Sequence, residues 1–121
     1  MKPVLSVLLI EDDPNVRLGC EQAMQLAGIP VIAVASAEEG QRQLDADFAG
    51  IVVTDMRLPG MDGMALLRWV NQLTPDLPVI IITGHGDVTL AVEAMRSGAY
   101  DFMQKPFSTN DLVEVVRRAL E

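Results

Sequence analysis

Short apolar runs alternate with amphipathic, helix-like segments five times along the chain. The first run, residues 4–10, is almost entirely apolar, which is typical of a strand buried on both faces. Further runs predict four more strands, at residues 30–35, 50–55, 78–83 and 101–104. This strict alternation predicts an α/β fold, in which one parallel sheet is covered by helices on both faces.

The first two predicted helices have clear start signals. Asp13 precedes Pro14, a favoured combination for an N-cap and a first helical position, and this helix is expected to stop near Gly28. The stretch Ser36-Ala37-Glu38-Glu39 is a capping box that opens a short helix ending at about Leu44.

Signals also mark the three remaining helices. A turn-forming loop at residues 58–63 leads into a helix that ends before Pro75. Asp87 is predicted to cap the next helix, which runs to Gly98, and Ser108 is predicted to cap a last helix that continues to the end of the chain.

The order of the strands decides where a ligand would lie. Right-handed crossovers restrict the topology of such a sheet, and ligands bind beyond the carboxyl ends of the strands, where the strand order reverses. For five strands in the order 2-1-3-4-5, that point lies between the first and third strands. Asp12 and Asp55 stand at the ends of these two strands.

Four polar residues end four of the predicted strands. They are Asp12, Asp55, Thr83 and Lys105. Because the carboxyl ends of parallel strands share one edge, we expect the four side chains to meet there. Two carboxylates, a hydroxyl and an ammonium group together predict Mg²⁺ binding and phosphoryl chemistry, with Asp55 as the nucleophile that becomes an acyl phosphate.

Three acids follow the first strand in a row, at Glu11, Asp12 and Asp13. Crowded carboxylates repel one another, and a hard cation relieves the repulsion. Mg²⁺ takes one or two carboxylates and keeps several waters, so Asp12 and Asp55 are the expected ligands and Glu11 is expected to act through water. Asp13 is better explained as the helix cap, although a metal role stays open. A solvated acidic turn is the alternative.

Lys105 is expected to neutralise Asp55 and later the phosphoryl oxygens. A cis bond before Pro106 would aim it, and an ordinary surface lysine is the alternative. Thr83 can donate a hydrogen bond to a phosphoryl oxygen, although threonine is common in strands. Phe102 lies near Lys105 and could pack inside or outside, depending on Thr83. For a lone aromatic residue, an ordinary core phenylalanine is the default expectation.

Three further residues, His85, Cys20 and Trp69, are not expected to take part in catalysis or metal binding. His85 stands alone between two glycines, so we expect an exposed loop histidine and no metal ligand. Cys20 is the only cysteine, which excludes an internal disulfide and predicts a small buried hydrophobe. Trp69 is expected to be a partly buried packing residue.

Composition narrows the function. A chain of 121 residues suffices for one domain, and its net charge of −8 argues against direct binding of nucleic acid. No apolar run approaches the roughly 18 residues of a membrane span, and the first residues lack the layout of a signal peptide. A cytoplasmic location is therefore expected.

Five motifs stand out along the chain: Leu8-Leu9-Ile10-Glu11-Asp12-Asp13, Asp55-Met56-Arg57-Leu58-Pro59-Gly60-Met61-Asp62-Gly63, Ile82-Thr83-Gly84, Gly98-Ala99 and Lys105-Pro106-Phe107. Together they resemble the receiver domain of two-component response regulators, which has a flavodoxin-like fold, and the resemblance covers essentially the whole chain. Residues 84–87 and 98–102 are similar to those of receivers of nitrogen-regulatory and C4-dicarboxylate-transport regulators.

The resemblance implies specific roles. A sensor histidine kinase would phosphorylate Asp55, Mg²⁺ would also contact the backbone carbonyl of Arg57, and Thr83 and Phe102 would form a switch pair. Side chains at Arg57 and His85 would tune the phosphoryl lifetime. The chain departs from many members at two positions, where Glu11 stands in place of aspartate and Phe102 in place of tyrosine.

The resemblance also implies partners. The surface of the fourth helix, fifth strand and fifth helix would mediate dimerisation or control a C-terminal output domain, of the sigma-54-type AAA+ class, the helix-turn-helix class or both. The last helix reaches Glu121 without a stop signal, so residues 1–121 are expected to be a receiver excised from a longer chain. Such a receiver catalyses its own phosphorylation and dephosphorylation but acts mainly as a switch.

Three alternatives remain open from the sequence. A stand-alone receiver would act by binding a partner protein. A phosphohydrolase of the haloacid dehalogenase type would need an acid where Arg57 stands, as well as an inserted cap. A flavodoxin-like carrier of FMN would need a phosphate-binding loop where Glu11, Asp12 and Asp13 would repel phosphate.

Overall fold

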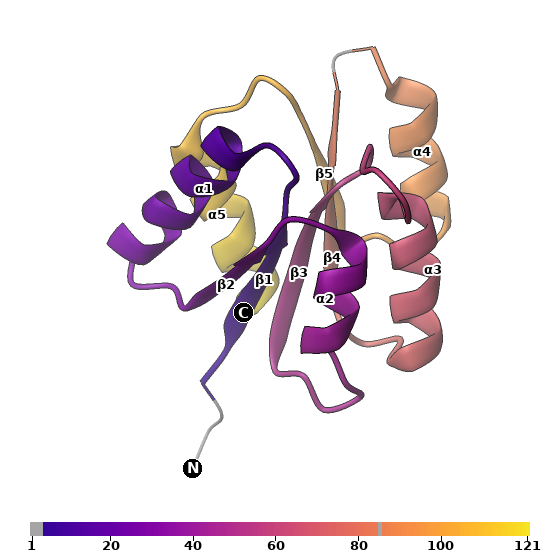
Figure 1. Ribbon diagram of the computed structural model, residues 1–121, viewed down its shortest axis with the longest axis horizontal. Helices are drawn as coiled ribbons and strands as arrows, with labels where there is room; N and C mark the ends of the chain where they lie inside the picture. Colours follow the sequence, from indigo (N-terminus) through magenta and orange to yellow (C-terminus); the bar gives the residue numbers. More distant parts are fainter. Residues whose placement is uncertain (1–3, 85) are drawn as a thin grey trace.

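The computed structural model describes residues 4–84 and 86–121. Five parallel strands form one sheet in the order β2-β1-β3-β4-β5, which confirms the predicted topology (Figure 1). Since β1 lies between β2 and β3, the sheet reverses its direction of growth between β1 and β3. The strands are β1 (Ser6–Ile10), β2 (Val31–Val34), β3 (Gly50–Asp55), β4 (Val79–Thr83) and β5 (Asp101–Gln104).

Helices cover both faces of the sheet. Figure 1 shows α1 and α5 on one face and α2, α3 and α4 on the other. The helices are α1 (Pro14–Leu26), α2 (Ala37–Gln43), α3 (Gly63–Leu73), α4 (Val88–Arg96) and α5 (Thr109–Leu120).

Successive residues of the central strands pack into two separate hydrophobic cores, one on each face of the sheet. Leu8 and Val52 pack with α2, α3 and α4, whereas Leu9 and Val53 pack with α1 and α5. All four side chains are fully buried. Burial on both faces explains why the central strands read as continuous apolar runs in the sequence.

The first strand is shorter than the apolar run that predicted it. Val4 and Leu5 are 74% and 40% exposed, and the strand begins at Ser6. The amide of Ser6 donates to the carbonyl of Ala49, where pairing with the segment leading into β3 begins. A strand extends only as far as its neighbours can pair with it, which hydrophobicity alone does not report.

Three of the four predicted side-chain caps are present. The Asp13 carboxylate accepts from the amides of Asn15 and Val16, and Ser108 Oγ accepts from the amide of Asp111 at 3.1 Å. Ser36 likewise caps α2.

Two details of capping differ from the prediction. The return bond of the capping box at α2 runs from the amide of Ala35 to Glu39, instead of from the Ser36 amide. Asp87 stands at the N-cap position of α4 but makes no side-chain capping bond, so its predicted role is wrong. Its carboxylate is engaged elsewhere, as described with the site.

Individual residues outside the site behave as expected. Cys20 is buried, and burial raises the pKa of its thiol above the ordinary value. Trp69 is partly buried against the core of α2, α3 and α4. Among the described residues, no helix has both the length and the apolar character that crossing a bilayer requires.

Gly50 fixes the place where β3 starts beside β1. It pairs with Ser6 and has a φ of +147°, a conformation that favours glycine. A Cβ atom at this position would collide with the carbonyl oxygen of Ser6. Gly19 differs, because it lies inside α1 with nothing within 4 Å of its missing Cβ.

We therefore expect opposite effects from the same substitution at two glycines. Gly50→Ala should lower the free energy of unfolding by at least about 2 kcal/mol, because of the collision and the unfavourable φ. Gly19→Ala should raise it by about 0.5–1 kcal/mol, because alanine favours the helix. Urea denaturation measures both, and a loss of stability at both positions would contradict this account of Gly50.

Candidate functional site

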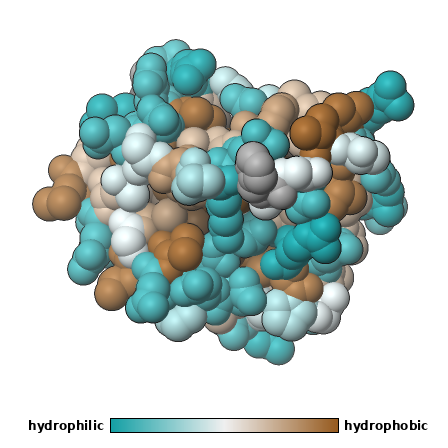
Figure 2. Space-filling model, turned by 90° about the horizontal axis from the view of Figure 1, so that it is seen from above, coloured by the Kyte–Doolittle hydropathy of each residue, from teal (hydrophilic) through white to brown (hydrophobic). Residues whose placement is uncertain are grey.

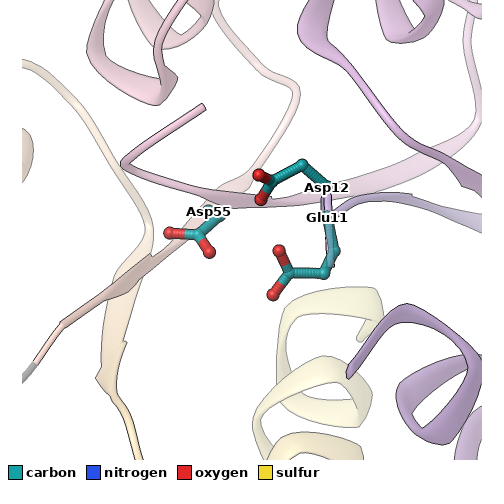
Figure 3. A group of neighbouring side chains, drawn as sticks. All are labelled: Glu11, Asp12 and Asp55. Atoms are coloured by element: carbon teal, nitrogen blue, oxygen red, sulfur yellow. The ribbon is translucent and has the colours of Figure 1, made fainter. Parts of the chain in front are cut away.

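Three carboxylates converge at the carboxyl ends of β1 and β3. One oxygen from each of Glu11, Asp12 and Asp55 lies within 4.8 Å of the others. Figure 3 shows the three side chains pointing into the same space. Glu11 and Asp55 are 1% and 6% exposed, whereas Asp12 faces solvent. The sheet order brings these acids together, as the sequence predicted.

Lys105 joins the two buried carboxylates. Its ammonium nitrogen lies 2.6 Å from Asp55 Oδ2 and 2.9 Å from Glu11 Oε1. Burial alone would lower the pKa of Lys105, but its hydrogen bonds to Asp55 and Glu11 outweigh burial and raise that pKa. The peptide bond between Lys105 and Pro106 is cis. The sequence-based expectation that this lysine meets Asp55 agrees with the geometry.

The remaining oxygens of the buried acids meet backbone amides. Asp55 Oδ1 accepts from the amide of Arg57 at 3.2 Å, and Glu11 Oε2 accepts from the amide of Asp13 at 3.3 Å. Burial raises the pKa of Glu11; the hydrogen bond from Lys105 opposes this shift, and the charge of Asp55 reinforces it. The cluster thus carries negative charge that one ammonium group only partly balances.

The surface around the cluster is mixed. Figure 2 looks down on the upper end of the molecule in Figure 1, where hydrophilic side chains separate several hydrophobic patches. The exposed Asp12 lies beside two buried acids, so the acidic space is open to solvent on the Asp12 side. Small ions can therefore approach it from outside.

Thr83 ends β4 as predicted, but its hydroxyl already has a partner. The side chain is fully buried, and Oγ1 donates to the carbonyl oxygen of Met103 on β5 at 3.3 Å. The hydroxyl of Thr83 is therefore already engaged. A phosphoryl oxygen would have to replace an existing bond between two neighbouring strands.

Phe102 is exposed, which corrects the expectation of an ordinary core phenylalanine. Its relative exposure is 39%, whereas its neighbour Met103 is 9% exposed. Since side chains alternate along a strand, Met103 enters the core of α1 and α5, and Phe102 points to the other face. At the edge of the sheet that face is incompletely covered.

Arg57 and Asp87 form a bridge between two loops. The Nε and Nη2 atoms of Arg57 lie 3.0 Å from the two carboxylate oxygens of Asp87. This two-pronged pair connects the loop after β3 with the start of α4, and it explains why Asp87 does not cap that helix. The hydrogen bonds from Arg57 hold the pKa of Asp87 below its ordinary value.

Asp13 and His85 were the two remaining residues with a role expected from the sequence. Asp13 caps α1 and does not belong to the group of converging carboxylates found among the described residues. His85 was expected to be an exposed loop residue, and it lies outside the residues that the structure describes.

Sequence reasoning overlooked Arg17. This residue lies in α1, and its Nη1 donates to the backbone carbonyl of Glu11 at 2.8 Å. A weaker contact of 3.5 Å joins the same nitrogen to the carbonyl of Asp12. The available signal was a basic residue one helical turn beyond a run of three acids.

The donor set fits a hard divalent cation. Carboxylate oxygens are the ligands that Mg²⁺ and Ca²⁺ prefer, and the three that converge here include buried ones that repel one another. Histidine and cysteine, which suit softer metals, are absent from this group. The residues present are therefore capable of holding such an ion.

Comparison with protein families decides the classification. The family model described as response regulator receiver domain matches residues 7–117. This chain is a response regulator receiver domain. The sequence-based recognition is confirmed, and the match favours the receiver over the phosphohydrolase and the flavin carrier.

Relatives support this classification. The receiver is 52% identical to the C4-dicarboxylate transport transcriptional regulatory protein DctD of Rhizobium meliloti (strain 1021), over 100% of this chain and 26% of that protein. It is 38% identical to the DNA-binding transcriptional regulator NtrC of Escherichia coli (strain K12), over 94% of this chain and 24% of that protein. The chain thus spans about a quarter of these relatives.

A solved structure agrees in fold. The receiver domain of NtrX from Brucella abortus superposes with a TM-score of 0.89 at 33% identity, over 95% of this chain and 98% of that one. Receivers generally bind Mg²⁺ at an acidic pocket and work with a histidine kinase, and this receiver has a group of acidic side chains that could hold a metal ion.

We expect Arg57→Met to raise the pKa of Asp87 toward the ordinary aspartate value of about 3.9. Arg57 stabilises the charged carboxylate of Asp87, and its removal therefore removes the cause of the lowered pKa. In the wild type, the ion pair is fully formed at pH values above the ordinary pKa of aspartate and is lost as the pH falls through the lowered pKa of Asp87. A carboxyl NMR titration measures the change.

Arg68→Met is the matched control, because Arg68 pairs with Glu93, a different acid, and leaves Asp87 untouched. An Asp87 pKa that stays low in Arg57→Met, or that rises equally in the control, would show that the observed bridge does not set it.

Proposed function

We propose that Asp55 is the phosphoryl acceptor of this receiver and that the donor is the phosphohistidine of a sensor kinase. The observation that carries the proposal is the position of Asp55, a buried carboxylate 2.6 Å from an ammonium and grouped with two further acids. A carboxylate oxygen attacks phosphorus, the P–N bond of the phosphohistidine breaks, and the nitrogen keeps the electron pair and takes up a proton.

Mg²⁺ is the proposed cofactor. The carboxylates of Asp12 and Asp55 and the backbone carbonyl of Arg57 would hold it, with Glu11 acting through water. When bound, the ion supplies positive charge that offsets the carboxylates and the incoming phosphoryl oxygens. Asp55 then presents its oxygen in a fixed direction, because an amide and an ammonium already hold it.

Lys105 and Thr83 respond to the new charge. The ammonium of Lys105 transfers its contact from the carboxylate of Asp55 to a phosphoryl oxygen and remains the clamp. The hydroxyl of Thr83 gives up the carbonyl of Met103 and donates to the phosphoryl group. Phe102, on the same strand as Met103, then turns inward from its exposed position.

The exposed surface of α4 and β5 is the proposed output face, together with α5. This face carries apolar side chains that a partner would cover, so it suits dimerisation or contact with an output domain. The size of the response is limited by the difference in phosphoryl contacts between the two states. The exposed apolar residues are Val88, Val92, Met95, Tyr100 and Phe102.

The receiver is proposed to be part of a larger cytoplasmic regulator. Residues 1–121 would form its receiver domain, and an output domain of the AAA+ or helix-turn-helix class would follow. The support is that related regulators of transcription are about four times as long as this chain. The receiver would catalyse its own phosphorylation and dephosphorylation, as a switch and without binding nucleic acid itself.

We expect acetyl phosphate and Mg²⁺ to add one phosphoryl group to the wild type, visible by intact-mass spectrometry. Asp55→Asn should gain no phosphoryl mass, because an amide cannot form the acyl phosphate. Omitting Mg²⁺ should suppress the gain in the wild type.

Asp62→Asn is the control, since Asp62 lies in the loop between β3 and α3 but caps α3, where it accepts from the amide of Ala65. It should be phosphorylated like the wild type. An equal gain of mass in Asp55→Asn, or no gain in the wild type, would refute the proposed function.

A second expected outcome concerns the switch. With beryllium fluoride and Mg²⁺, the ring resonances of Phe102 should shift in the wild type and stay near their starting positions in Thr83→Ala, which lacks the hydroxyl. Two-dimensional NMR measures this, and Thr89→Ala on the exposed side of α4 is the control. Identical shifts in all three proteins would show that the movement of Phe102 does not depend on the Thr83 hydroxyl.

A further inference from the structure

Arg17 ties the first helix back to the acidic loop. Its backbone amide donates to the carbonyl of Asp13 at 2.9 Å, in the first turn of α1. Its side chain then folds back, and Nη1 donates to the carbonyl of Glu11 at 2.8 Å, with a weaker contact of 3.5 Å to the carbonyl of Asp12. Arg17, a partly buried residue, therefore holds the backbone of the loop and not its carboxylates.

This contact matters most for Asp12. Glu11 and Asp55 are each held by Lys105 and by a backbone amide. The carboxylate of Asp12, in contrast, accepts no hydrogen bond from any of the described residues, and it is exposed. Its direction toward the other acids, visible in Figure 3, consequently depends on the conformation of its own backbone.

We infer that Arg17 is a positioning residue of the cation site, which fixes the backbone of the loop so that the Asp12 carboxylate faces Asp55. The inference rests on the proposed function for its Mg²⁺ site and adds a residue to it. Removing a group that orients a metal ligand without binding the metal itself typically lowers metal affinity by about 10–100-fold.

A competing effect has the opposite sign. Arg17 is itself a cation, so removing it would strengthen Mg²⁺ binding if long-range repulsion dominated. Repulsion across solvent is weak because water has a high dielectric constant, and the guanidinium donates to backbone carbonyl oxygens and not to the carboxylates that would hold the ion. Positioning therefore outweighs repulsion, and the direction of the change tests this.

The experiment compares Arg17→Met with Arg117→Met by titration calorimetry with MgCl₂. Arg117 is the matched control, since its guanidinium also donates to a backbone carbonyl, that of Ala27 at 3.2 Å, but at the far end of α1. Arg17→Met should raise the Kd for Mg²⁺ about tenfold or more, and Arg117→Met should leave it within twofold of the wild type.

Phosphorylation by acetyl phosphate provides a second measurement. Arg17→Met should need about tenfold more Mg²⁺ for its half-maximal rate and should approach the wild-type rate at saturating Mg²⁺. A general loss of structure would instead lower the maximal rate. A Kd in Arg17→Met that equals the wild-type value, or one that is lower, overturns the inference.

A metal-free measurement keeps the inference separate from the proposed function. In EDTA, the amides of Glu11 and Asp13 should exchange their hydrogens about tenfold faster in Arg17→Met than in the wild type, whereas amides in β4 should not change. Unchanged exchange at both loop amides overturns the positioning role of Arg17. Loss of Mg²⁺ binding or of Asp55 phosphorylation in the wild type would refute the proposed function instead.

Discussion

The site depends on the close packing of like charges that one lysine partly offsets. The strand order places β1 beside β3, so the acids that follow both strands share one space, and two of them are buried. Lys105 stabilises the pair from the far end of the sequence, at 2.6 and 2.9 Å. The same crowding that lowers the stability of the fold favours the binding of a hard cation, because the cation offsets the repulsion between the carboxylates.

Features governed by neighbouring residues could be predicted from the sequence. The central strands are continuous apolar runs because both faces are buried, and Asp13, Ser36 and Ser108 cap helices that begin directly after them. The meeting of Asp55 and Lys105 was also predictable, since parallel strands align their ends at one edge.

Features governed by a choice between distant partners could not be predicted. Asp87 has a suitable position for a cap, but Arg57, thirty residues earlier, offers two hydrogen bonds to its carboxylate. Thr83 finds the carbonyl of Met103 across the sheet, and Phe102 remains exposed because the edge of the sheet is incompletely covered. In each case the outcome depends on packing in three dimensions, which local patterns do not encode.

The diverted carboxylate of Asp87 has a consequence for how easily one helix comes apart. The other four helices start with a side chain bonded to an early amide, from Asp13, Ser36, Asp62 and Ser108. Such bonds typically stabilise a helix by about 0.5–2 kcal/mol, and α4 begins without one. Unwinding the first turn of α4 therefore breaks no side-chain cap, unlike unwinding the first turn of the other four helices, and the sheet beneath can stay intact while it opens.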